Sequence, residues 1–574
     1  MSQHSKDVSI VVGGSAGQGV QTVEAALMKI LKDAGYGVFA CKEYMSRVRG
    51  GSNSVEIRVS STRSPRRAYV RRIDFLFAMD AAAVPHLGWR IGPDTLVFAE
   101  AGQAGDVAPG RRIDTPILSF ANEAGGSPLY ANSVVLGVVL GILNVPFSGA
   151  ESYLRRAFSR KGDDIVAKNI DAARKGYEFG KHTSFVEDIA VALSPSEDRK
   201  DDLLLDGTTA LGIGAVAGGC DFISSYPMSP ATGVLAFLAK EAKRFGIVVD
   251  QAEDEISAIN AGLGASYAGA RAMVTTSGGG FDLMQEGVSL SGIIETPIVI
   301  HIGQRPGPAT GLPTRTEQGD LNLALHAGHG EFVRAIYAPG TVPEAVGVMQ
   351  HAFETADRYQ VPAFVLSDQY FLDSVATVDE GDLPRIPVAR HISETDEGYL
   401  RYALTEDGLS SRGVPGYGKG LVCVDSDEHD ENGRITESFE VRRVMMEKRW
   451  KRLEAMRESA ILPSPSDNLD AAETAVVCWG SNRGAVEEAL GRLGSVKLGG
   501  LHFSQVFPIN PKVKKMLKGK EIVVVENNHT GQFADLLARE LGVKVSRRIL
   551  KSTGEPFSVE ELMDELKLES KTKN

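Results

Sequence analysis

The stretch Ala272-Met-Val-Thr-Thr-Ser-Gly-Gly-Gly280 decides the fold. Its apolar and β-branched first half predicts a strand over 272–276, and the three glycines predict a tight turn into a helix. Such a turn lets backbone N–H groups approach an anion or a flat ring, although a plain tight turn explains the same pattern. A strand, a glycine turn and a helix in this order predict an α/β fold.

The same alternation surrounds this stretch on both sides. Each further strand is followed by a cluster of polar, Gly or Pro residues, and these strands are expected at 220–224, 246–250, 297–302 and 361–366. In an open parallel sheet such loops converge at the carboxyl edge, where ligands bind. Residues 203–372 are therefore predicted to form one domain with its site at that edge.

The remaining chain is predicted to contain two more α/β units and an arm. Residues 1–192 open with strand 8–12, the turn Gly13-Gly-Ser-Ala-Gly-Gln-Gly19 and a helix, which indicates a parallel sheet. For the whole chain we expect a multi-domain α/β fold with parallel or mixed sheets flanked by helices. Residues 471–574 contain strands 474–478 and 521–525. Between them, residues 373–470 are irregular and charge-rich, and end in a helix over 438–456. We interpret the basic run 448–452 there as a subunit-contact element rather than a nucleic-acid site.

Charge and composition exclude several function classes. The net charge of −12 does not suit a general nucleic-acid binder, so none is expected. Residues 42–72 depart from this balance, with nine Lys and Arg against two Asp and Glu. Together with the turn 13–19, which matches neither a dinucleotide motif nor a Walker loop, this basic stretch is a phosphate-binding candidate.

Membrane and metal functions are not expected from the sequence. No apolar run reaches the ~18 residues that span a bilayer, and the polar N-terminus does not resemble a signal peptide, so a cytoplasmic protein is predicted. The four cysteines are far apart and form no C-x-x-C pair. They therefore provide no iron–sulfur or thiolate zinc site of their own, and no metal ligands are assigned.

Glu255 is the first candidate for chemistry. It lies near the start of a predicted helix, about 253–269, whose residues are almost all small. A carboxyl group buried there would have a raised pKa and would suit proton transfer. The alternative is an acid that only complements the helix dipole.

The loop that follows strand 297–302 holds the second set of candidates. Arg305, Thr314 and Arg315 lie among Gly and Pro residues. A guanidinium group binds a carboxylate with two parallel hydrogen bonds, and a threonine hydroxyl can add a third. The alternative is a surface loop with solvated arginines.

Taken together, these clusters resemble the alpha subunit of 2-oxoacid:ferredoxin oxidoreductases, with a gamma-type domain in front. The resemblance rests on motifs in both parts of the chain: Gly14-Ser-Ala-Gly-Gln-Gly-Val20, Glu43-Tyr-Met-Ser-Arg-Val-Arg-Gly-Gly51, Val55-Glu-Ile-Arg-Val-Ser60, Tyr226-Pro-Met-Ser-Pro230, Glu253-x-Glu255, Thr276-Ser-Gly-Gly-Gly280, Arg305 with Thr314, and Gln318-Gly-Asp-Leu321. The run Gly311-Leu-Pro-Thr314 and the gamma–alpha order most resemble the 2-oxoglutarate branch.

This resemblance implies thiamine diphosphate chemistry and a set of site residues. Residues 203–372 would be the pyrimidine-binding domain, and residues 471–574 would resemble a transketolase C-terminal domain. Glu255 would activate the cofactor by protonating its pyrimidine ring. The substrate would be held by Ser229, Arg305, Thr314 and Arg315, and the cofactor would also contact Tyr226, Pro227, Ser277, Gly278 and Gly279. Ser229 stands where the family usually has Thr. Coenzyme A would be associated with Gly14, Gly17, Gly19, Arg47, Arg49 and Gly50.

The family's chemistry also implies a partner. The chain has neither the Gly-Asp-Gly motif that thiamine enzymes use to bind diphosphate nor the cysteines of an iron–sulfur cluster. A beta subunit would therefore supply Mg²⁺ and a four-iron four-sulfur cluster, in a dimer of alpha–beta heterodimers that reduces ferredoxin. The alternatives are pyruvate or a branched-chain 2-oxoacid as substrate, or a non-catalytic nucleotide-binding regulatory subunit.

Overall fold

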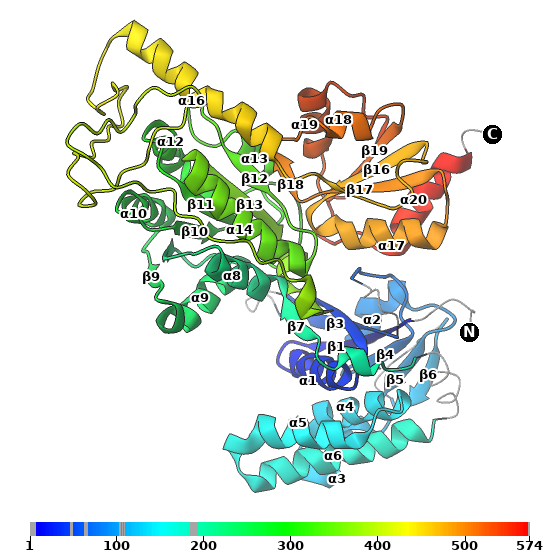
Figure 1. Cartoon of the computed structure of the whole chain (residues 1–574). Coiled ribbons are helices and arrows are strands. Elements are labelled where there is room, and N and C mark those ends of the chain that lie inside the picture. Colours follow the sequence, from blue (N-terminus) through cyan, green and yellow to red (C-terminus); the bar gives the residue numbers. More distant parts are fainter. Residues whose placement is uncertain are drawn as a thin grey trace. The chain divides into compact units, whose positions relative to one another are not determined.

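The computed structural model describes residues 7–571, except 46–49, 62–66, 103–104, 106, 108 and 184–192 (Figure 1). The chain forms two compact units. Unit 1 consists of Met1–Leu205, Asp373–Asp382 and Ser558–Glu561, and unit 2 of Asp206–Leu372, Leu383–Phe557 and Leu562–Asn574. Two short segments of unit 1 therefore come from ranges that the sequence assigned to the connecting arm and to the last domain.

Unit 1 is built on an eight-stranded mixed sheet. In spatial order its strands are β6 (Arg111–Asp114), β5 (Leu96–Ala99), β4 (Phe75–Ala78), β1 (Asp7–Ser15), β3 (Ser52–Ser60), β2 (Gly37–Glu43), β14 (Val375–Val378) and β7 (Leu203–Asp206). β1 is parallel to β4 but antiparallel to β3, which is antiparallel to β2. The sheet is therefore mixed: β1, β4, β5 and β6 run parallel, as the sequence predicts, whereas β3 inserts antiparallel between β1 and β2.

Helices pack against this sheet and against one another. They are α1 (Val20–Asp33), α2 (Ala83–Leu87), α3 (Ile117–Gly125), α4 (Ala131–Ile142), α5 (Phe147–Phe158) and α6 (Asp163–Lys181). α4 and α6 approach closely, since a Cβ atom on Gly176 would meet the backbone of Val134. Among the described residues no single helix has the length and apolar character to cross a membrane. Only the bent pair Ile117–Gly125 and Pro128–Ile142 meets those criteria together.

Unit 2 contains a seven-stranded sheet that is parallel except at one edge. Its order is β18 (Gln505–Phe507), β12 (Ala335–Tyr337), β13 (Pro362–Asp368), β11 (Ile298–Gln304), β10 (Ala272–Thr276), β8 (Phe222–Ser225) and β9 (Val248–Gln251). The edge strand β18 runs antiparallel to β12. The helices that accompany this sheet are α8 (Gly207–Ala217), α9 (Thr232–Phe245), α10 (Glu255–Tyr267), α11 (Gly278–Asp282), α12 (Gln285–Ile293), α13 (Leu321–Leu325), α14 (Val342–Tyr359) and α15 (Gln369–Asp373).

A second, five-stranded sheet completes unit 2. Its order is β15 (Ser464–Pro465), β17 (Leu498–Phe503), β16 (Thr474–Trp479), β19 (Glu521–Glu526) and β20 (Arg547–Leu550), with helices α17 (Arg483–Leu493), α18 (Val513–Met516), α19 (Gln532–Leu541) and α20 (Val559–Lys571). One buried apolar cluster contains Ile300 and Phe364 from the larger sheet together with Trp479 and Phe533 from this part. The two sheets therefore share a core.

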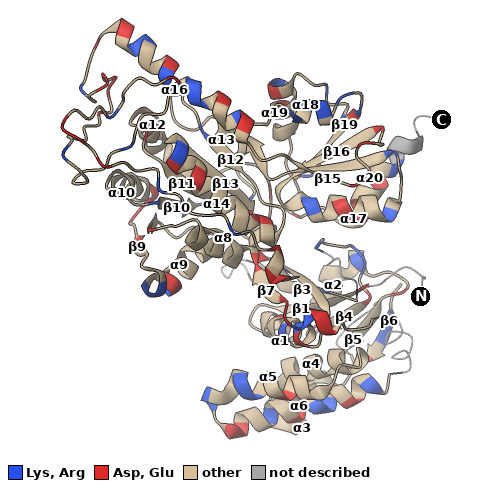
Figure 2. Cartoon of the chain, viewed as in Figure 1, with Lys and Arg blue, Asp and Glu red and all other residues tan. Residues whose placement is uncertain are grey.

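The arm ends in the long helix α16 (Phe439–Ser459), on which charged residues of both signs follow one another (Figure 2). Lys448 and Arg452 are buried and pair with Glu295, and Arg449 is buried and pairs with Glu428. The interpretation of run 448–452 as a subunit-contact element is therefore wrong for these three cations, because they form ion pairs inside unit 2.

Candidate functional site

The carboxyl edge of the seven-stranded sheet collects several of the predicted site residues. The neighbouring strands β8, β10 and β11 lead directly into the loops that carry Ser229, Ser277 and Arg305. Arg305 Nη1 donates a hydrogen bond to the backbone oxygen of Ser229 at 2.8 Å. The loop convergence expected from the sequence is thus present.

Glu255 is the first residue of α10, and its side chain is buried. The cap of the helix is Asp254, whose Oδ1 accepts a hydrogen bond from Ser257 N at 2.7 Å, so capping does not depend on Glu255. Glu255 is 3% exposed, and its Oε1 has no hydrogen-bond partner among the described residues. Burial raises the pKa of this carboxyl group, and Asp254 adds to the rise. Glu253, two residues earlier, is exposed.

The glycines after β10 make room for two acids. A Cβ atom on Gly280 would overlap Glu255 Oε1 and Thr276 Oγ1, and a Cβ atom on Gly278 would lie 2.5 Å from Asp320 Oδ1. Gly279 between them is exposed, and a Cβ atom there would meet only Ala309 O, at 3.8 Å. We call residues 277–280, with the carboxyl groups of Glu255 and Asp320, the glycine cradle.

Three buried polar atoms of this cradle lack a hydrogen-bond partner among the described residues: Glu255 Oε1, Ser277 Oγ and Asp320 Oδ2. Leaving such an atom unpaired costs about 1–3 kcal/mol, and native proteins contain few of them. Three such unpaired atoms around one turn indicate a place where a polar ligand completes the hydrogen bonding.

Asp320 is the residue of this cradle that sequence reasoning missed. Its backbone N–H donates to Gln304 Oε1 at 3.1 Å, which places it beside the end of β11. Burial raises the pKa of Asp320 to about 7, the neighbouring Glu317 adds to the rise, and Arg305 opposes it. The motif Gln318-Gly-Asp-Leu321 was the only signal in the sequence, and motif membership alone assigns no role.

The loop after β11 has two parts with different surroundings. Arg305 is half-buried, and burial lowers its pKa while Asp320 acts in the opposite direction. Arg315 packs near Gly554, and the next residue, Thr316, donates its N–H to Gly554 O at 3.1 Å. Thr314 is half-buried on the same segment. The structure therefore joins Arg305 with Ser229 and Asp320, and holds Arg315 against the C-terminal part of unit 2.

Gln318 fastens this loop to the five-stranded sheet. Its side chain donates to Trp479 O at 2.9 Å and accepts from Asn482 Nδ2 at 2.7 Å and from Asn527 N at 2.9 Å. Its backbone N–H donates to Asn527 O at 2.6 Å. Asp320 is two residues away, so the position of the loop at the cradle depends on this buried junction.

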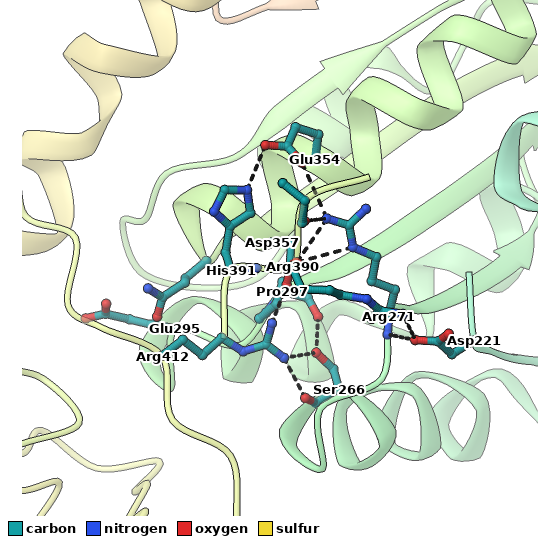
Figure 3. A network of polar contacts seen from close by, with 12 residues as sticks. Asp221, Ser266, Arg271, Glu295, Pro297, Glu354, Asp357, Arg390, His391 and Arg412 are labelled. Atoms are coloured by element: carbon teal, nitrogen blue, oxygen red, sulfur yellow. Dashed lines mark hydrogen bonds and ion pairs between the residues drawn. The ribbon is translucent and has the colours of Figure 1, made fainter. Parts of the chain in front are cut away.

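A polar network holds the far end of α10 (Figure 3). Arg412 of the arm donates to Ser266 O at 2.7 Å and also pairs with Asp357, which Arg271 contacts at 3.0 Å. Burial lowers the pKa of Arg412 to about 10. The arm is thereby anchored on the helix that begins with Glu255.

The rim of the site is apolar and exposed. Ile256 is 50% exposed, Leu283 53% and Tyr226 40%; Pro227 beside Tyr226 is half-buried. Next to Ile256 and Leu283 lies a hollow of about 540 Å³ that Phe332 and Met446 also line. Large apolar side chains gathered at the rim of a site indicate a surface that another chain covers.

In unit 1 the structure brings the two glycine segments together. Ser15 at the end of β1 is in register with Ser52 at the start of β3, and Ala16 N donates to Gly51 O. Gly17, Gly19 and Gly50 have positive φ angles, and open space surrounds Gly17 and Gly50. Gly14 lies in β1. Arg47 and Arg49 lie outside the described residues.

The part of the chain that the structure describes contains no group of three or more His, Cys, Asp or Glu side chains suited to hold a metal ion. The four cysteines are free, and three of them are buried.

Two protein-family models match this chain, one in unit 1 and one largely in unit 2. Residues 9–179 match the family model described as pyruvate ferredoxin/flavodoxin oxidoreductase, and residues 213–448 match the one described as pyruvate flavodoxin/ferredoxin oxidoreductase, thiamine diphosphate-binding. The 2-oxoacid:ferredoxin oxidoreductase subunit alpha of Sulfolobus sp is 31% identical, over 97% of this chain and 96% of that protein.

Two further similarities concern 2-oxoglutarate. The 2-oxoglutarate oxidoreductase subunit KorA of Mycobacterium tuberculosis is 29% identical, over 75% of this chain and 67% of that protein. The solved structure of 2-oxoglutarate:ferredoxin oxidoreductase from Magnetococcus marinus, with 2-oxoglutarate, coenzyme A and succinyl-CoA bound, is 28% identical. It covers 99% of this chain and 100% of that one, with a TM-score of 0.92.

Proposed function

The chain belongs to the 2-oxoacid:ferredoxin oxidoreductase family as an alpha subunit, and from this premise we propose that its substrate is 2-oxoglutarate. With coenzyme A, the acid would yield succinyl-CoA and CO₂, while two electrons pass to ferredoxin. The whole-length similarity to the Magnetococcus marinus enzyme, whose structure contains 2-oxoglutarate and succinyl-CoA, supports this substrate. The KorA relatives support it as well.

The glycine cradle fits the pyrimidine end of thiamine diphosphate. A flat ring that carries nitrogen atoms and an amino group offers partners to the three unpaired buried atoms of Glu255, Ser277 and Asp320. The exposed backbone of Gly279 leaves a surface against which such a ring can lie. When bound, the cofactor supplies a nucleophilic carbon that attacks the 2-oxo group.

Glu255 is the residue that would hold a proton at a ring nitrogen. Its raised pKa keeps the carboxyl group protonated at a higher pH than an exposed glutamate, which suits sharing a proton with a nitrogen base. Ser229 and Arg305, with Thr314 and Arg315 on the following segment, would bind the substrate. Tyr226 and Pro227 would lie at the entrance.

A beta subunit would complete the site. The exposed apolar rim around Tyr226, Ile256 and Leu283 is the surface that it would cover. That partner would carry the diphosphate-binding motif, Mg²⁺ and the four-iron four-sulfur cluster, since the sequence of this chain has no Gly-Asp-Gly and no clustered cysteines. We further propose that coenzyme A binds unit 1 at Gly14, Gly17, Gly19 and Gly50, with Arg47 and Arg49.

The proposed function is tested by co-purifying the chain with its beta partner. Coenzyme A-dependent reduction of a viologen dye is measured with 2-oxoglutarate, pyruvate and branched-chain 2-oxoacids. We expect the highest kcat/KM with 2-oxoglutarate, and no turnover by the single chain supplied with thiamine diphosphate, Mg²⁺ and coenzyme A. A preference for another acid would overturn the substrate, and activity of the single chain would overturn the shared site. A complex that binds no thiamine would favour a regulatory subunit.

Arg305→Lys should lower kcat/KM for the 2-oxoacid by about one to two powers of ten, because lysine keeps the charge but loses the two-pronged hydrogen bond, worth roughly 1.5–3 kcal/mol. Steady-state kinetics of the alpha–beta complex measure this loss, with the KM for coenzyme A as internal control. Arg244→Lys, at an exposed residue with one loose ion pair at 3.8 Å, is the matched control. A wild-type value for Arg305→Lys would move the role to Arg315 or to the partner.

A further inference from the structure

Asp320 and Arg305 form an incomplete pair at the sheet edge. Arg305 donates one hydrogen bond, to the backbone oxygen of Ser229, and no carboxylate of the described chain lies within ion-pair distance of it. Asp320 is the one acid whose charge acts on it in the structure. Conversely, Asp320 Oδ2 is buried without a hydrogen-bond partner among the described residues. Each group can therefore form a further hydrogen bond. The charges of the two groups also act on one another.

The other charges around Asp320 come from several elements. Glu317 lies three residues earlier on the same loop and disfavours a negative charge on Asp320, and Glu317 is in turn influenced by His529 from the loop after β19. The α11 side contributes Gly278, which is uncharged, and across Gly280 lies Glu255 of α10. Arg305 is the only cation that acts on Asp320 in this part of the structure.

We propose that Asp320 is a positioning residue that takes up one proton from solvent when the carboxylate of the 2-oxoacid binds Arg305. This rests on the proposed function, in which Arg305 binds that carboxylate. A second anion beside Arg305 repels the charge of Asp320 and also draws on the guanidinium group that had stabilised it. The neutral carboxyl group that results can donate a hydrogen bond from the atom that now lacks a partner.

The consequence is a proton-linked affinity for substrate. Burial already brings the pKa of Asp320 to about 7, so the free site holds a mixture of both forms near neutrality. The bound substrate raises that pKa further. The Kd of the 2-oxoacid should therefore be constant well below pH 7 and should rise about tenfold per pH unit above it, until the pH reaches the pKa in the bound state.

The experiment uses the alpha–beta complex that carries Glu255→Gln. This change slows turnover by about 10²–10⁴-fold and also removes the ionisation of Glu255 from the profile. Binding of 2-oxoglutarate, or of whichever 2-oxoacid the substrate panel ranks first, is measured by calorimetry between pH 6 and 9 without coenzyme A. Two buffers of different ionisation enthalpy report the number of protons taken up. We expect a fraction of one proton per site at pH 7.5, and a Kd about fivefold weaker at pH 8 than at pH 7.

Variants of Asp320 and Glu317 distinguish this proposal from a purely structural role of Asp320. Adding Asp320→Asn should abolish proton uptake and flatten the pH profile, with the affinity at pH 8.5 equal to or better than that of the parent. Glu317→Gln should keep proton uptake but move the rise in Kd to lower pH, since Glu317 helps to raise the pKa of Asp320. Thiamine retention and thermal unfolding show whether each variant is folded.

A pH-independent Kd in the parent complex would overturn the proposal, as would a profile that survives Asp320→Asn. If Asp320→Asn does not fold, Asp320→Ser replaces it, and the shift with Glu317→Gln decides on its own. These outcomes differ from failure of the proposed function, which would appear in the substrate panel as a preference for another acid.

Discussion

Glu255→Gln in the alpha–beta complex should lower turnover by about 10²–10⁴-fold, the usual contribution of general acid–base catalysis. Glutamine keeps the shape of the side chain and can still form a hydrogen bond, but it cannot exchange a proton with a ring nitrogen. The side chain is 3% exposed and its Oε1 atom lies close to Gly280, but glutamine has nearly the same shape as glutamate, so the change introduces little steric strain. Stopped-flow or steady-state viologen reduction measures the loss.

Thiamine diphosphate should remain bound to this variant, because the partner would hold the diphosphate. Glu253→Gln is the matched control, since Glu253 is an exposed acid two residues away on the same chain segment. It should retain nearly the full rate. The assignment is wrong if Glu255→Gln keeps more than about a tenth of the rate, or if Glu253→Gln is the more damaging change.

Glu295→Gln should destabilise unit 2 by roughly 3–5 kcal/mol, the usual cost of leaving buried charges without their partner. Glu295 is 1% exposed and pairs with both Lys448 and Arg452 of α16, which are equally buried. Burial alone would raise the pKa of Glu295, but Arg452 and Lys448 outweigh it and lower that pKa. Hydrogen exchange along α16 should quicken strongly, and the thermal unfolding midpoint should fall.

Glu440→Gln provides the comparison on the same helix. Its ion pair with Arg443 is exposed, and such pairs contribute little to stability. Replacing all three buried groups together, with Glu295→Leu, Lys448→Met and Arg452→Met, should recover part of the loss, because the two paired cations are removed with their partner and only the charge of the nearby Arg401 remains. Equal effects of Glu295→Gln and Glu440→Gln would contradict this account.

Much of unit 2 was predictable because its strands are short apolar runs followed by glycine turns. Strand 272–276 agrees with β10 at both ends, and the helix expected near 253–269 is α10, Glu255–Tyr267. Unit 1 was predicted less well. β3 alternates Val55, Ile57 and Val59 with Glu56 and Arg58, and its antiparallel insertion depends on buried ion pairs such as Glu56–Arg90, which periodicity does not reveal. β14 pairs with β2 from more than three hundred residues away, and no local pattern predicts such a pairing.

The candidate site also contains residues that the sequence predicted and residues that it did not. Strand-end position was enough to select Glu255, Ser277 and Arg305, because loops of parallel strands meet at one edge. Asp320 lies well beyond the end of β11, and it is held at the cradle by Gln304, which accepts from Asp320 N, and by Gln318, which bonds its loop to the five-stranded sheet. Likewise, Lys448, Arg449 and Arg452 read as surface charges until their buried partners are known.

The junction at Gln318 also limits how freely the parts of this enzyme can be exchanged. Its single amide side chain is shared by Trp479 O, Asn482 and the backbone of Asn527, three points that belong to the five-stranded sheet and its turns. A chimaera that takes residues 471–574 from a relative would have to preserve these three hydrogen-bonding positions. Otherwise the graft should fold but shift the substrate loop, so that a few matched hydrogen bonds at this junction matter more for exchange than overall sequence identity.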